Sequence, residues 1–545
     1  MHAQQKPQYP PTERKLGKFL PWLFLAIVII LAAAIRFRLL DVPLERDEGE
    51  YAYAGQLMLQ GIPPYSLAYN MKMPGIYAAY ALILAVFGQT CAGIHLGLLL
   101  VNAATTLLIF LLAKYLTDSW AGVFAAAAFA VMSLSLPVQG LFANAEHFVI
   151  LFAVPGLLLL LYAVDRNKQL VLLAGSVLLG IGFLMKQHGS AFIVFAGLYL
   201  LFAQLRRKPL LFKSLVVQAA VFGAGVAAPF AVTCLILWRG GVFDKFWFWT
   251  FVYAREYVSM MTLRDGLAGL KFQAIYIAGC AVLICVLAII GVLALFLNNK
   301  MRYLSPFLVG FSLFSFLSVC PGFYFRQHYF VLLLPAIALL SGVGQFYIRQ
   351  VLKPPIPAIA KNLIAILLTL AAPLYTLYHQ RDYLFESDPA VVSRMTYPYE
   401  HFPAYLKIAE YIRANSSSDD TIAVLGSEPQ IFFYAHRRSA SAYVYDFPLL
   451  EPQPYAPQMQ QEMIQQIQTA QPRFLLVEYR SFYWIARSTS NILTLDWLQQ
   501  YGRHYHLVGL IDFVSDDTEV YRWNRDAASY LSTFSEGVAI FQRNQ

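Results

Sequence analysis

Hydrophobic runs long enough, or nearly long enough, to cross a bilayer recur along this 545-residue chain. The hydrocarbon core of a bilayer takes about 20 apolar residues of helix, which satisfies its own backbone hydrogen bonds. Of all residues, 59% are hydrophobic and only 13% are charged, whereas a soluble domain has about a quarter charged. The sequence therefore predicts a polytopic α-helical membrane protein. The runs lie at about 19–40, 75–89, 92–113, 120–138, 147–164, 170–185, 188–205, 215–238, 273–297, 304–320, 328–348 and 361–378.

Basic loops between the runs predict the orientation, because Lys and Arg concentrate in cytoplasmic loops. Counting forward from a cytoplasmic tail at 1–18 puts 41–73 outside, and counting back from later basic loops puts everything after about 380 outside. Twelve spans would not satisfy both counts. We therefore expect an odd total, eleven or thirteen, with one run between 75 and 164 split or re-entrant. The basic residues used are Arg14, Lys15, Lys18, Arg206, Arg207, Lys208, Lys213, Lys300, Arg302, Arg349 and Lys353.

After Tyr378 the composition changes, and Asp, Ser, Gln and Pro become frequent. Short β-branched and apolar runs alternate there with helical patterns, which is typical of an α/β domain. The segment has a normal domain size. We predict a transmembrane domain at 19–379, with a first outer loop at 41–73, and an extracytoplasmic α/β domain at 380–545. Strands are expected at 421–426, 473–478, 506–514 and 519–523, and helices at 402–414 and 458–470.

Several function classes find no support in the sequence. The net charge is +9, but the basic residues lie in short loops where topology requires them, so nucleic acid is not a predicted partner. Phosphate-binding Gly-rich loops, His-Glu-x-x-His and Gly-x-Ser-x-Gly motifs do not occur. The five cysteines lie in or beside apolar runs, which argues against a disulfide framework and a zinc site.

Three acidic residues follow directly on the first hydrophobic run. Asp47, Glu48 and Glu50 lie where a charge beside lipid costs free energy unless it meets a cation, a helix cap or water. Asp47 as N-cap, with Glu50 three residues later, would form a capping box. Three acids in four positions exceed what a cap needs. A capping role and a catalytic role both remain open from the local sequence, and they are compatible.

Basic and aromatic residues form further clusters on the predicted outer face. Lys72 precedes the second run, as a snorkelling lysine or as an ammonium for a phosphate. Arg326 and His328 lie between spans with Tyr324 and Tyr329. Arg matches phosphate oxygens bidentately, and an aromatic belt with an interfacial Arg is the structural alternative.

Two more polar breaks contain Lys186 and Glu146. Each break alone is more typical of a solvated loop than of a site. By the counting above, however, both face outward with the other clusters. This convergence on one face of the membrane favours a functional site.

The motifs around these residues resemble one family. Residues 47–52 (DEGEYA), 59–65 (LQGIPPY) and 72–77 (KMPGIY) resemble the bacterial polyprenyl-phosphate-dependent glycosyltransferases of the GT-C fold. These are similar to protein O-mannosyltransferases (glycosyltransferase family 39) and lipid A aminoarabinose transferases. Residues 325–330 (FRQHYF) and 424–430 (VLGSEPQ) fit the same family.

The resemblance implies a transferase of the bacterial inner membrane whose partners are a polyprenyl-phosphate sugar donor and membrane lipid. It gives Asp47 the role of catalytic base and Lys72 that of donor-phosphate ligand. We add Glu48 as a second catalytic candidate. Arg326, His328 and Lys186 complete the phosphate clamp, and Glu50, Tyr324, Tyr329 and Glu146 are secondary substrate contacts. The cofactor stays open: a divalent metal ion is not supported, because Met71 stands where aminoarabinose transferases have an acid.

A phosphodiester is a good leaving group, so the step needs a base for the acceptor hydroxyl and cations for the developing phosphate charge. Single displacement inverts the anomeric centre. A retaining mechanism would need Glu48 or Glu50 as a second carboxylate, but adjacent helical residues point apart. Alternatives are a transporter or flippase for a lipid-linked or anionic solute, a binding protein with a merely structural acidic loop, and a ligase or polymerase on lipid-linked oligosaccharide. The sequence does not identify the sugar or the acceptor.

Overall fold

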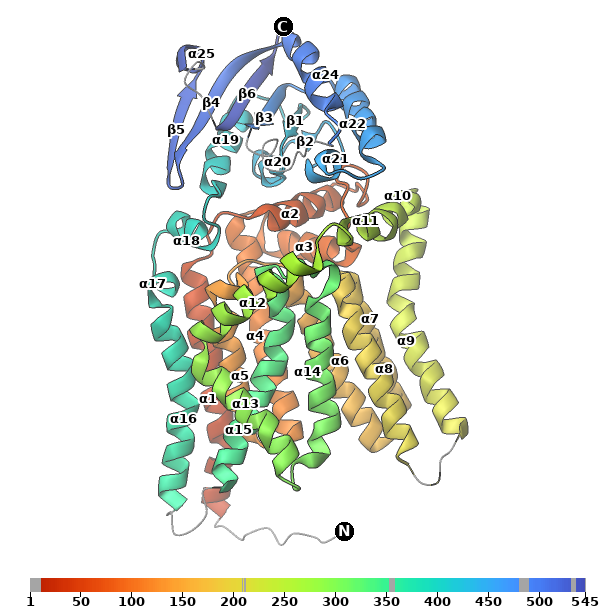
Figure 1. The fold of residues 1–545 in the computed structure, drawn as a ribbon, viewed down its shortest axis with the longest axis vertical. Helices are drawn as coiled ribbons and strands as arrows, with labels where there is room; N and C mark the ends of the chain where they lie inside the picture. The colour runs from red at the N-terminus through yellow and green to blue at the C-terminus, as the bar shows by residue number, and fades with distance from the viewer. Residues whose placement is uncertain are drawn as a thin grey trace.

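A computed structural model describes residues 11–207, 209, 212–351, 358–479, 490–530 and 536–544. A bundle of apolar helices is followed by an α/β domain, which covers one end of the bundle (Figure 1). We call this end the domain end. Lys208, Lys353 and the first ten residues of the predicted cytoplasmic tail lie outside the described residues.

Every predicted hydrophobic run coincides with one or more helices of the structure. In the described ranges, seven helices are long and apolar enough to cross a membrane, or eight if the bent pair of α12 and α13 forms one span. Fewer segments pass this test than the eleven to thirteen spans predicted, since α3, α5 and α7 have only 14, 14 and 17 residues. The bundle helices are α1 (Pro11–Arg38), α4 (Cys91–Leu116), α5 (Ser119–Met132), α6 (Ala145–Arg166), α7 (Gln169–Met185), α8 (Ser190–Leu205), α9 (Phe212–Arg239), α13 (Val282–Leu297), α14 (Ser305–Val319), α15 (Leu334–Val351) and α16 (Ala358–His379).

The predicted run at 75–89 does not pass from one end of the bundle to the other. It forms α3 (Pro74–Phe87), which lies beneath α2 (Arg46–Leu59) at the domain end (Figure 1). At its start, Gly75 packs on Leu184 in the last turn of α7. The helix that follows it begins at Cys91, whose Sγ contacts the Tyr434 hydroxyl of the α/β domain. Both ends of α3 therefore lie at the domain end, so this run does not cross the bundle; the odd total of spans stays a prediction.

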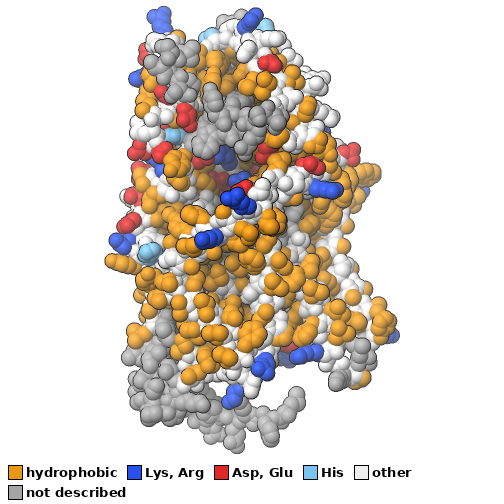
Figure 2. All heavy atoms as spheres, in the orientation of Figure 1, with side chains coloured by type: hydrophobic (Ala, Val, Ile, Leu, Met, Phe, Trp, Pro, Cys, Tyr) orange, Lys and Arg blue, Asp and Glu red, His pale blue; other side chains and the backbone are white. Residues whose placement is uncertain are grey.

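A second group of short helices follows α9 along the domain end. They are α10 (Phe243–Trp247), the π-helical η3 (Phe248–Tyr253), α11 (Ala254–Val258) and α12 (Leu263–Cys280). The chain then bends by 103° from α12 into α13. Figure 2 shows apolar side chains covering the bundle below this level, while charged side chains gather between the bundle and the α/β domain.

The α/β domain contains a six-stranded sheet of order β2-β1-β3-β6-β4-β5 among the described residues. Strand β1 (Thr421–Leu425) is parallel to β2 (Arg438–Ser439) and β3 (Phe474–Glu478), and the other pairings are antiparallel. The remaining elements are β4 (Tyr505–Ser515), β5 (Thr518–Trp523), β6 (Gly537–Arg543), α17 (Arg381–Leu384), α18 (Pro389–Thr396), α19 (Phe402–Ala414), α20 (Gln430–Ala435), α21 (Phe447–Leu450), α22 (Ala456–Ala470), α24 (Leu493–Tyr501) and α25 (Arg525–Tyr530). The four predicted strands and two predicted helices are present, and β2 and β6 were not predicted.

The domain packs directly on the first loop of the bundle. Gly49 of α2 lies so close to Gln430 that a Cβ atom would come within 2.6 Å of its side chain. The rings of Tyr53 in α2 and Phe432 in α20 have centroids 5.1 Å apart. Both residues belong to an apolar core that continues from the bundle into the domain. Because the two parts share this core, the side chains between them have fixed positions.

Candidate active site

A cavity of about 900 Å³ lies between the bundle and the α/β domain. Its floor is built from the start of α2, the loop before α3 and the segments that join bundle helices at the domain end. Its roof is built from the α/β domain. Its lining includes Glu45, Arg46, Asp47, Asn70, Met71, Lys72, Gln139, Lys186, His188, Tyr257, Tyr324, Arg326, His328, Tyr329, Tyr397, Glu400, Phe402, Ser427, Tyr445, Glu451 and Glu478.

Asp47 and Lys72 form an ion pair in the floor, with Lys72 Nζ 2.6 Å from Asp47 Oδ2. Their side chains are 20% and 16% exposed, so both reach the cavity. The helix cap differs from the predicted one. Glu45 is the N-cap of α2 and exchanges hydrogen bonds with Glu48 in a capping box. Because Glu45 does the capping, the carboxylate of Asp47 is left for the cavity.

Burial disfavours the charged forms of Asp47 and Lys72, but the attraction between the two groups is stronger than this effect. Burial raises the pKa of Asp47, and the nearby cations, Lys72 first and also Lys186, hold it well below its usual range. Burial lowers the pKa of Lys72, and the carboxylates of Asp47 and Glu50 raise it above its ordinary value. Asp47 is therefore a carboxylate, and Lys72 an ammonium, throughout the neutral range.

Glu48 and Glu50 point away from the cavity, although the sequence suggested both as candidates. Glu48 is fully buried and accepts hydrogen bonds from His95 Nε2 at 3.1 Å and from the Ala143 N–H at 2.5 Å. These contacts join the first loop to the segment before α6. Glu48 therefore stabilises the packing of these segments. It does not lie beside the reacting groups, where the sequence analysis expected it.

Glu50 is also fully buried, and it supports the loop that carries Lys72. It accepts hydrogen bonds from Asn70 Nδ2 at 2.6 Å and from the Tyr77 hydroxyl. Burial raises the pKa of Glu50 to about 7, with Lys72 acting in the opposite sense. Glu50 thus fixes the position of Lys72 through Asn70 and does not itself line the cavity.

The second lysine of the floor is held from below. Lys186 forms a buried ion pair with Glu146 and lies 4.3 Å from the centre of the Tyr329 ring. Burial lowers the pKa of Lys186, and Glu146 opposes this effect. Lys186 and Tyr329 line the cavity, whereas Glu146 is fully buried beneath them. The sequence placed Glu146 at the substrate, but the structure makes it the partner of Lys186.

Arg326 and His328 line the same floor from the segment before α15. Arg326 donates to the Tyr257 hydroxyl at 3.1 Å and lies over the Tyr324 ring at 5.4 Å. His328 Nδ1 is 3.1 Å from Gln139 Oε1. The five predicted basic and acidic groups Asp47, Lys72, Lys186, Arg326 and His328 therefore meet in one cavity, together with Tyr324 and Tyr329.

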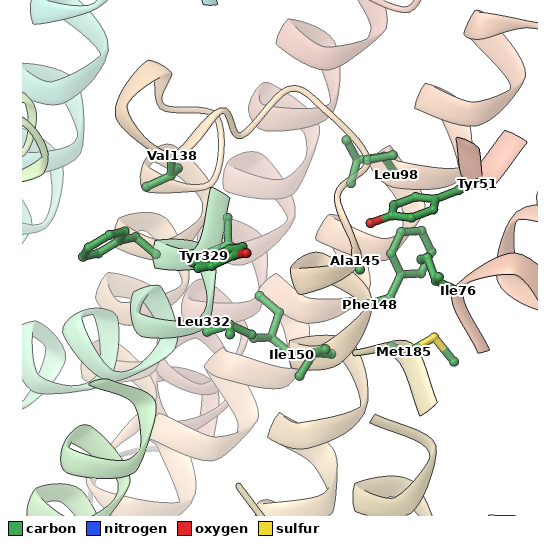
Figure 3. Packing of buried hydrophobic residues seen from close by; sticks show 14 of the residues in the cluster. Tyr51, Ile76, Leu98, Val138, Ala145, Phe148, Ile150, Met185, Tyr329 and Leu332 are labelled. Carbon is green, nitrogen blue, oxygen red and sulfur yellow. The ribbon is translucent and has the colours of Figure 1, made fainter. Parts of the chain in front are cut away.

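An apolar layer supports this floor. In Figure 3, the start of α6 at Ala145 lies between the rings of Tyr51 and Tyr329, with Phe148, Ile150 and Met185 beneath them. All six residues are buried in the same core. Tyr51 also carries a hydroxyl 3.4 Å from Asp47 Oδ2. The layer lies between the side chains that line the cavity and the apolar bundle.

Arg46, next to Asp47, is clamped by the α/β domain. Its guanidinium makes two hydrogen bonds of 2.7 Å to Glu400 and one of 2.7 Å to Glu428. Its Nε donates to the Ser427 carbonyl at 3.1 Å, and its own carbonyl accepts from the Tyr445 hydroxyl at 3.0 Å. The sequence singled out none of these contacts. Glu428 lies in a motif that carries the family resemblance and Arg46 directly precedes another, but nothing local links them.

The Glu428 carboxyl predicts a pH dependence of stability. Burial raises its pKa from 4.5 to about 7, although Arg46 opposes this. Between these values the folded state binds more protons than the unfolded state, so stability falls as the pH rises from about 4.5 to about 7. Glu428→Gln should make this fall shallower, by at most about 1.4 kcal/mol per pH unit. Thermal unfolding of the detergent-solubilised protein from pH 5 to 8 measures it.

The fold should accept Glu428→Gln. Gln430 donates to Glu428 at 2.6 Å, and the Gln430 Oε1 has no hydrogen-bond partner among the described residues. Rotating the Gln430 amide would restore the hydrogen bond. Glu410→Gln, on the exposed face of α19, is the matched control. Identical slopes for Glu428→Gln and the control would refute the assignment.

The side chains around Asp47 do not fit a hard divalent cation. Such ions take several oxygen ligands, but Asp47 Oδ2 is held by Lys72, and the neighbouring position is Met71, a thioether. Within the described ranges, no three His, Cys, Asp or Glu side chains are grouped so that they could hold a metal. The cations that line the cavity are therefore the ammonium and guanidinium groups of Lys72, Lys186 and Arg326.

Comparisons with known proteins agree with this architecture. Residues 71–233 match the family described as dolichyl-phosphate-mannose-protein mannosyltransferases. No curated protein matches the chain by sequence.

Solved structures match nearly the whole chain. ArnT from Cupriavidus metallidurans bound to undecaprenyl phosphate superposes with a TM-score of 0.55 at 15% identity, over 92% of this chain and 97% of that one. Its apo state gives 0.56, with the same identity and coverage. The oligosaccharyltransferase AglB from Archaeoglobus fulgidus, in complex with an inhibitory peptide and a dolichol-phosphate, gives 0.52 at 12% identity, over 93% and 75%.

These matches confirm the predicted fold class, a polytopic helical membrane protein with a C-terminal α/β domain. They also confirm the predicted resemblance. The chain has the GT-C fold of ArnT and AglB and, over residues 71–233, the sequence signature of the dolichyl-phosphate-mannose-protein mannosyltransferases.

Proposed function

We propose that this protein is an inverting glycosyltransferase that moves a sugar from a polyprenyl-phosphate donor to an acceptor hydroxyl on the extracytoplasmic face of the membrane. One observation carries the proposal: the ion pair of Asp47 and Lys72 lies in a cavity at the domain end, with further cations around it. A base and a phosphate clamp are thus side by side. ArnT, which shares the fold, has been solved with undecaprenyl phosphate bound.

The charges of the floor match a phosphodiester. Lys72, Lys186 and Arg326 supply three positive charges, and Asp47 and Glu146 pair with two of them. One positive charge remains among these groups, which balances the single negative charge of a sugar–phosphate–lipid diester. As the sugar leaves, the phosphate gains charge, and cations already in place stabilise it without reorganisation.

The reaction then needs only this chain's own groups. Asp47 accepts the proton of the acceptor hydroxyl, whose oxygen forms a bond to the anomeric carbon. The bond from that carbon to the phosphate oxygen breaks, and Lys72 and Arg326 hold the departing phosphate. Glu48 and Glu50 are engaged elsewhere, so no second carboxylate of the acidic loop is available as a nucleophile. This supports a single displacement with inversion.

The orientation follows from charge. Basic residues such as Arg206 and Arg302 lie in loops at the end of the bundle opposite the α/β domain, which favours that end as the cytoplasmic one. The cavity and residues 380–545 then face outward, as in a bacterial inner-membrane enzyme that receives lipid-linked sugars. A transporter would need its polar groups at mid-membrane on broken helices, whereas Asp47, Lys72 and Arg326 gather at the domain end.

Lipid binding tests the donor site without knowledge of the sugar. Purified protein should bind undecaprenyl phosphate saturably and at least about tenfold more tightly than undecaprenol, since a charge-assisted contact is worth more than 1 kcal/mol. Lys72→Ala should remove most of this difference, and Lys407→Ala, on the exposed face of α19, should not. Equal binding of the two lipids by the wild type would overturn the phosphate clamp.

A further inference from the structure

The two lysines of the cavity floor come from distant parts of the chain. Lys72 lies in the loop before α3, and Lys186 lies at the break between α7 and η2 (Gln187–Gly189). Burial lowers the pKa of Lys186, and the charge of Lys72 lowers it further, so the two ammonium groups lie near enough to repel each other. Each has its own carboxylate, Asp47 or Glu146. These two ion pairs neutralise the lysines but do not join one lysine to the other.

The side chain of Gln187 joins the two segments that carry these lysines. Gln187 directly follows Lys186 in the sequence. Its Nε2 donates at 2.7 Å to the carbonyl oxygen of Met71, which directly precedes Lys72. A longer contact of 3.4 Å joins the same Nε2 to the Thr250 carbonyl in η3. A side-chain amide carries two N–H donors, so it can make both contacts at once.

The backbone on both sides of this hydrogen bond is packed. The Tyr65 hydroxyl donates to the Lys72 carbonyl at 2.7 Å. A Cβ atom at Gly75 would lie 2.5 Å from the Leu184 carbonyl oxygen, so the start of α3 packs tightly on the end of α7. Because neither segment is loose, the hydrogen bond of Gln187 fixes the backbone of one lysine relative to that of the other.

We infer that Gln187 is a positioning residue of the phosphate clamp and fixes the spacing at which Lys72 and Lys186 hold one phosphate group. This inference rests on the proposed transferase function and adds a residue to its donor site. Two like charges move apart when nothing opposes their repulsion, whereas cations that are already in place stabilise a phosphate without reorganisation. Gln187 carries no charge, so it acts through the positions of the two ammonium groups.

Gln187→Met tests the inference, because it keeps the length of the side chain and removes both N–H donors. The full-length protein in detergent should then bind undecaprenyl phosphate about fivefold more weakly, the scale of one neutral hydrogen bond, while its affinity for undecaprenol stays the same. The matched control is Gln218→Met, which removes the hydrogen bonds of a buried glutamine in α9 that does not line the cavity. The control should lower thermal stability and leave the ratio of the two affinities unchanged.

A double variant separates positioning from packing. Lys186→Gln removes the charge but leaves a hydrogen-bond donor for Glu146. If Gln187 acts through the spacing of two cations, adding Gln187→Met to Lys186→Gln should weaken undecaprenyl phosphate binding by less than about twofold, because residues that act together are not additive.

The outcomes distinguish the inference from the donor site on which it rests. A fivefold loss that persists in the Lys186→Gln background, or a wild-type ratio of the two affinities in Gln187→Met, would overturn the inference and leave the donor site standing. Equal weakening of both lipids would also overturn it, since a purely structural hydrogen bond predicts that result. If the wild type binds both lipids equally, the donor site itself is wrong, and the inference is wrong with it.

Discussion

Replacing Asp47 by Asn is expected to reduce sugar transfer by about 10²–10⁴-fold, the contribution of a general base, while undecaprenyl phosphate still binds. Asn keeps the shape of the side chain but cannot take the acceptor's proton. The capping of α2 is unaffected, because Glu45 is its N-cap. Lys72 loses its partner, so the clamp becomes more positive and phosphate binding should hold or tighten.

The measurement is the rate of sugar transfer from a labelled polyprenyl-phosphate donor, run beside lipid binding and thermal unfolding. Asp496→Asn, on an exposed position of α24, is the matched control. Transfer by Asp47→Asn at the wild-type rate would exclude Asp47 as the base. Loss of both transfer and lipid binding would instead mean that the carboxylate is needed to build the site.

Removing Arg46 should give the largest loss of stability. Arg46→Ala leaves Glu428 fully buried and Glu400 without the guanidinium that both now share. Breaking a buried ion pair from one side typically costs about 3–5 kcal/mol when an uncompensated charge remains. We expect a smaller loss here, because the Arg46 side chain is 29% exposed and Glu428, whose pKa burial raises to about 7, takes up a proton once Arg46 is gone. Arg46→Lys keeps a charge but loses the planar two-pronged contact to Glu400, so we expect an intermediate loss.

The double variant Arg46→Ala with Glu428→Gln separates charge from packing. If the cost is the stranded carboxylate, the second substitution should recover much of the stability lost at pH 7.5, measured by thermal unfolding in detergent. No recovery would show that the guanidinium acts mainly through packing on Phe402, whose ring centre lies 5.5 Å from it.

The Arg46 clamp also has a consequence for catalysis. Both carboxylates that bind the Arg46 guanidinium, Glu400 and Glu428, come from the α/β domain, and Asp47 is the residue after Arg46. Domain docking and base placement are therefore coupled through one side chain. The position of the base therefore depends on the docking of the α/β domain.

The local elements were predictable from the sequence alone. Apolar runs predicted where the bundle helices lie, because hydrophobicity over about 20 residues is a local property. The helices α19 and α22 and the strands β1, β3, β4 and β5 followed in the same way from short-range periodicity. Strands β2 and β6 were not predicted. Strand β2 has only two residues. Strand β6 is stabilised mainly by pairing with β3, 60 or more residues away in the sequence, and with β4, a few tens of residues away.

Residues of the candidate site were predictable only where they lie close together in one part of the sequence. Asp47 and Lys72 are 25 residues apart and both lie in the first loop, so charge and position pointed to them. The N-cap of α2 is Glu45 and not Asp47. A local sequence pattern does not locate the start of a helix to within two residues. Glu48 and Glu50 face inward because their hydrogen-bond partners, among them Ala143 and Asn70, belong to other segments.

Contacts between distant segments became known only from the folded structure. The bond of Arg46 to Glu428 joins residues 382 positions apart, and α3 lies across the domain end although its composition resembles that of a span. Hydrophobicity and charge fix what each segment can do in water or lipid. Which partner satisfies a buried charge depends on how the segments pack, and that information is not local to any of them.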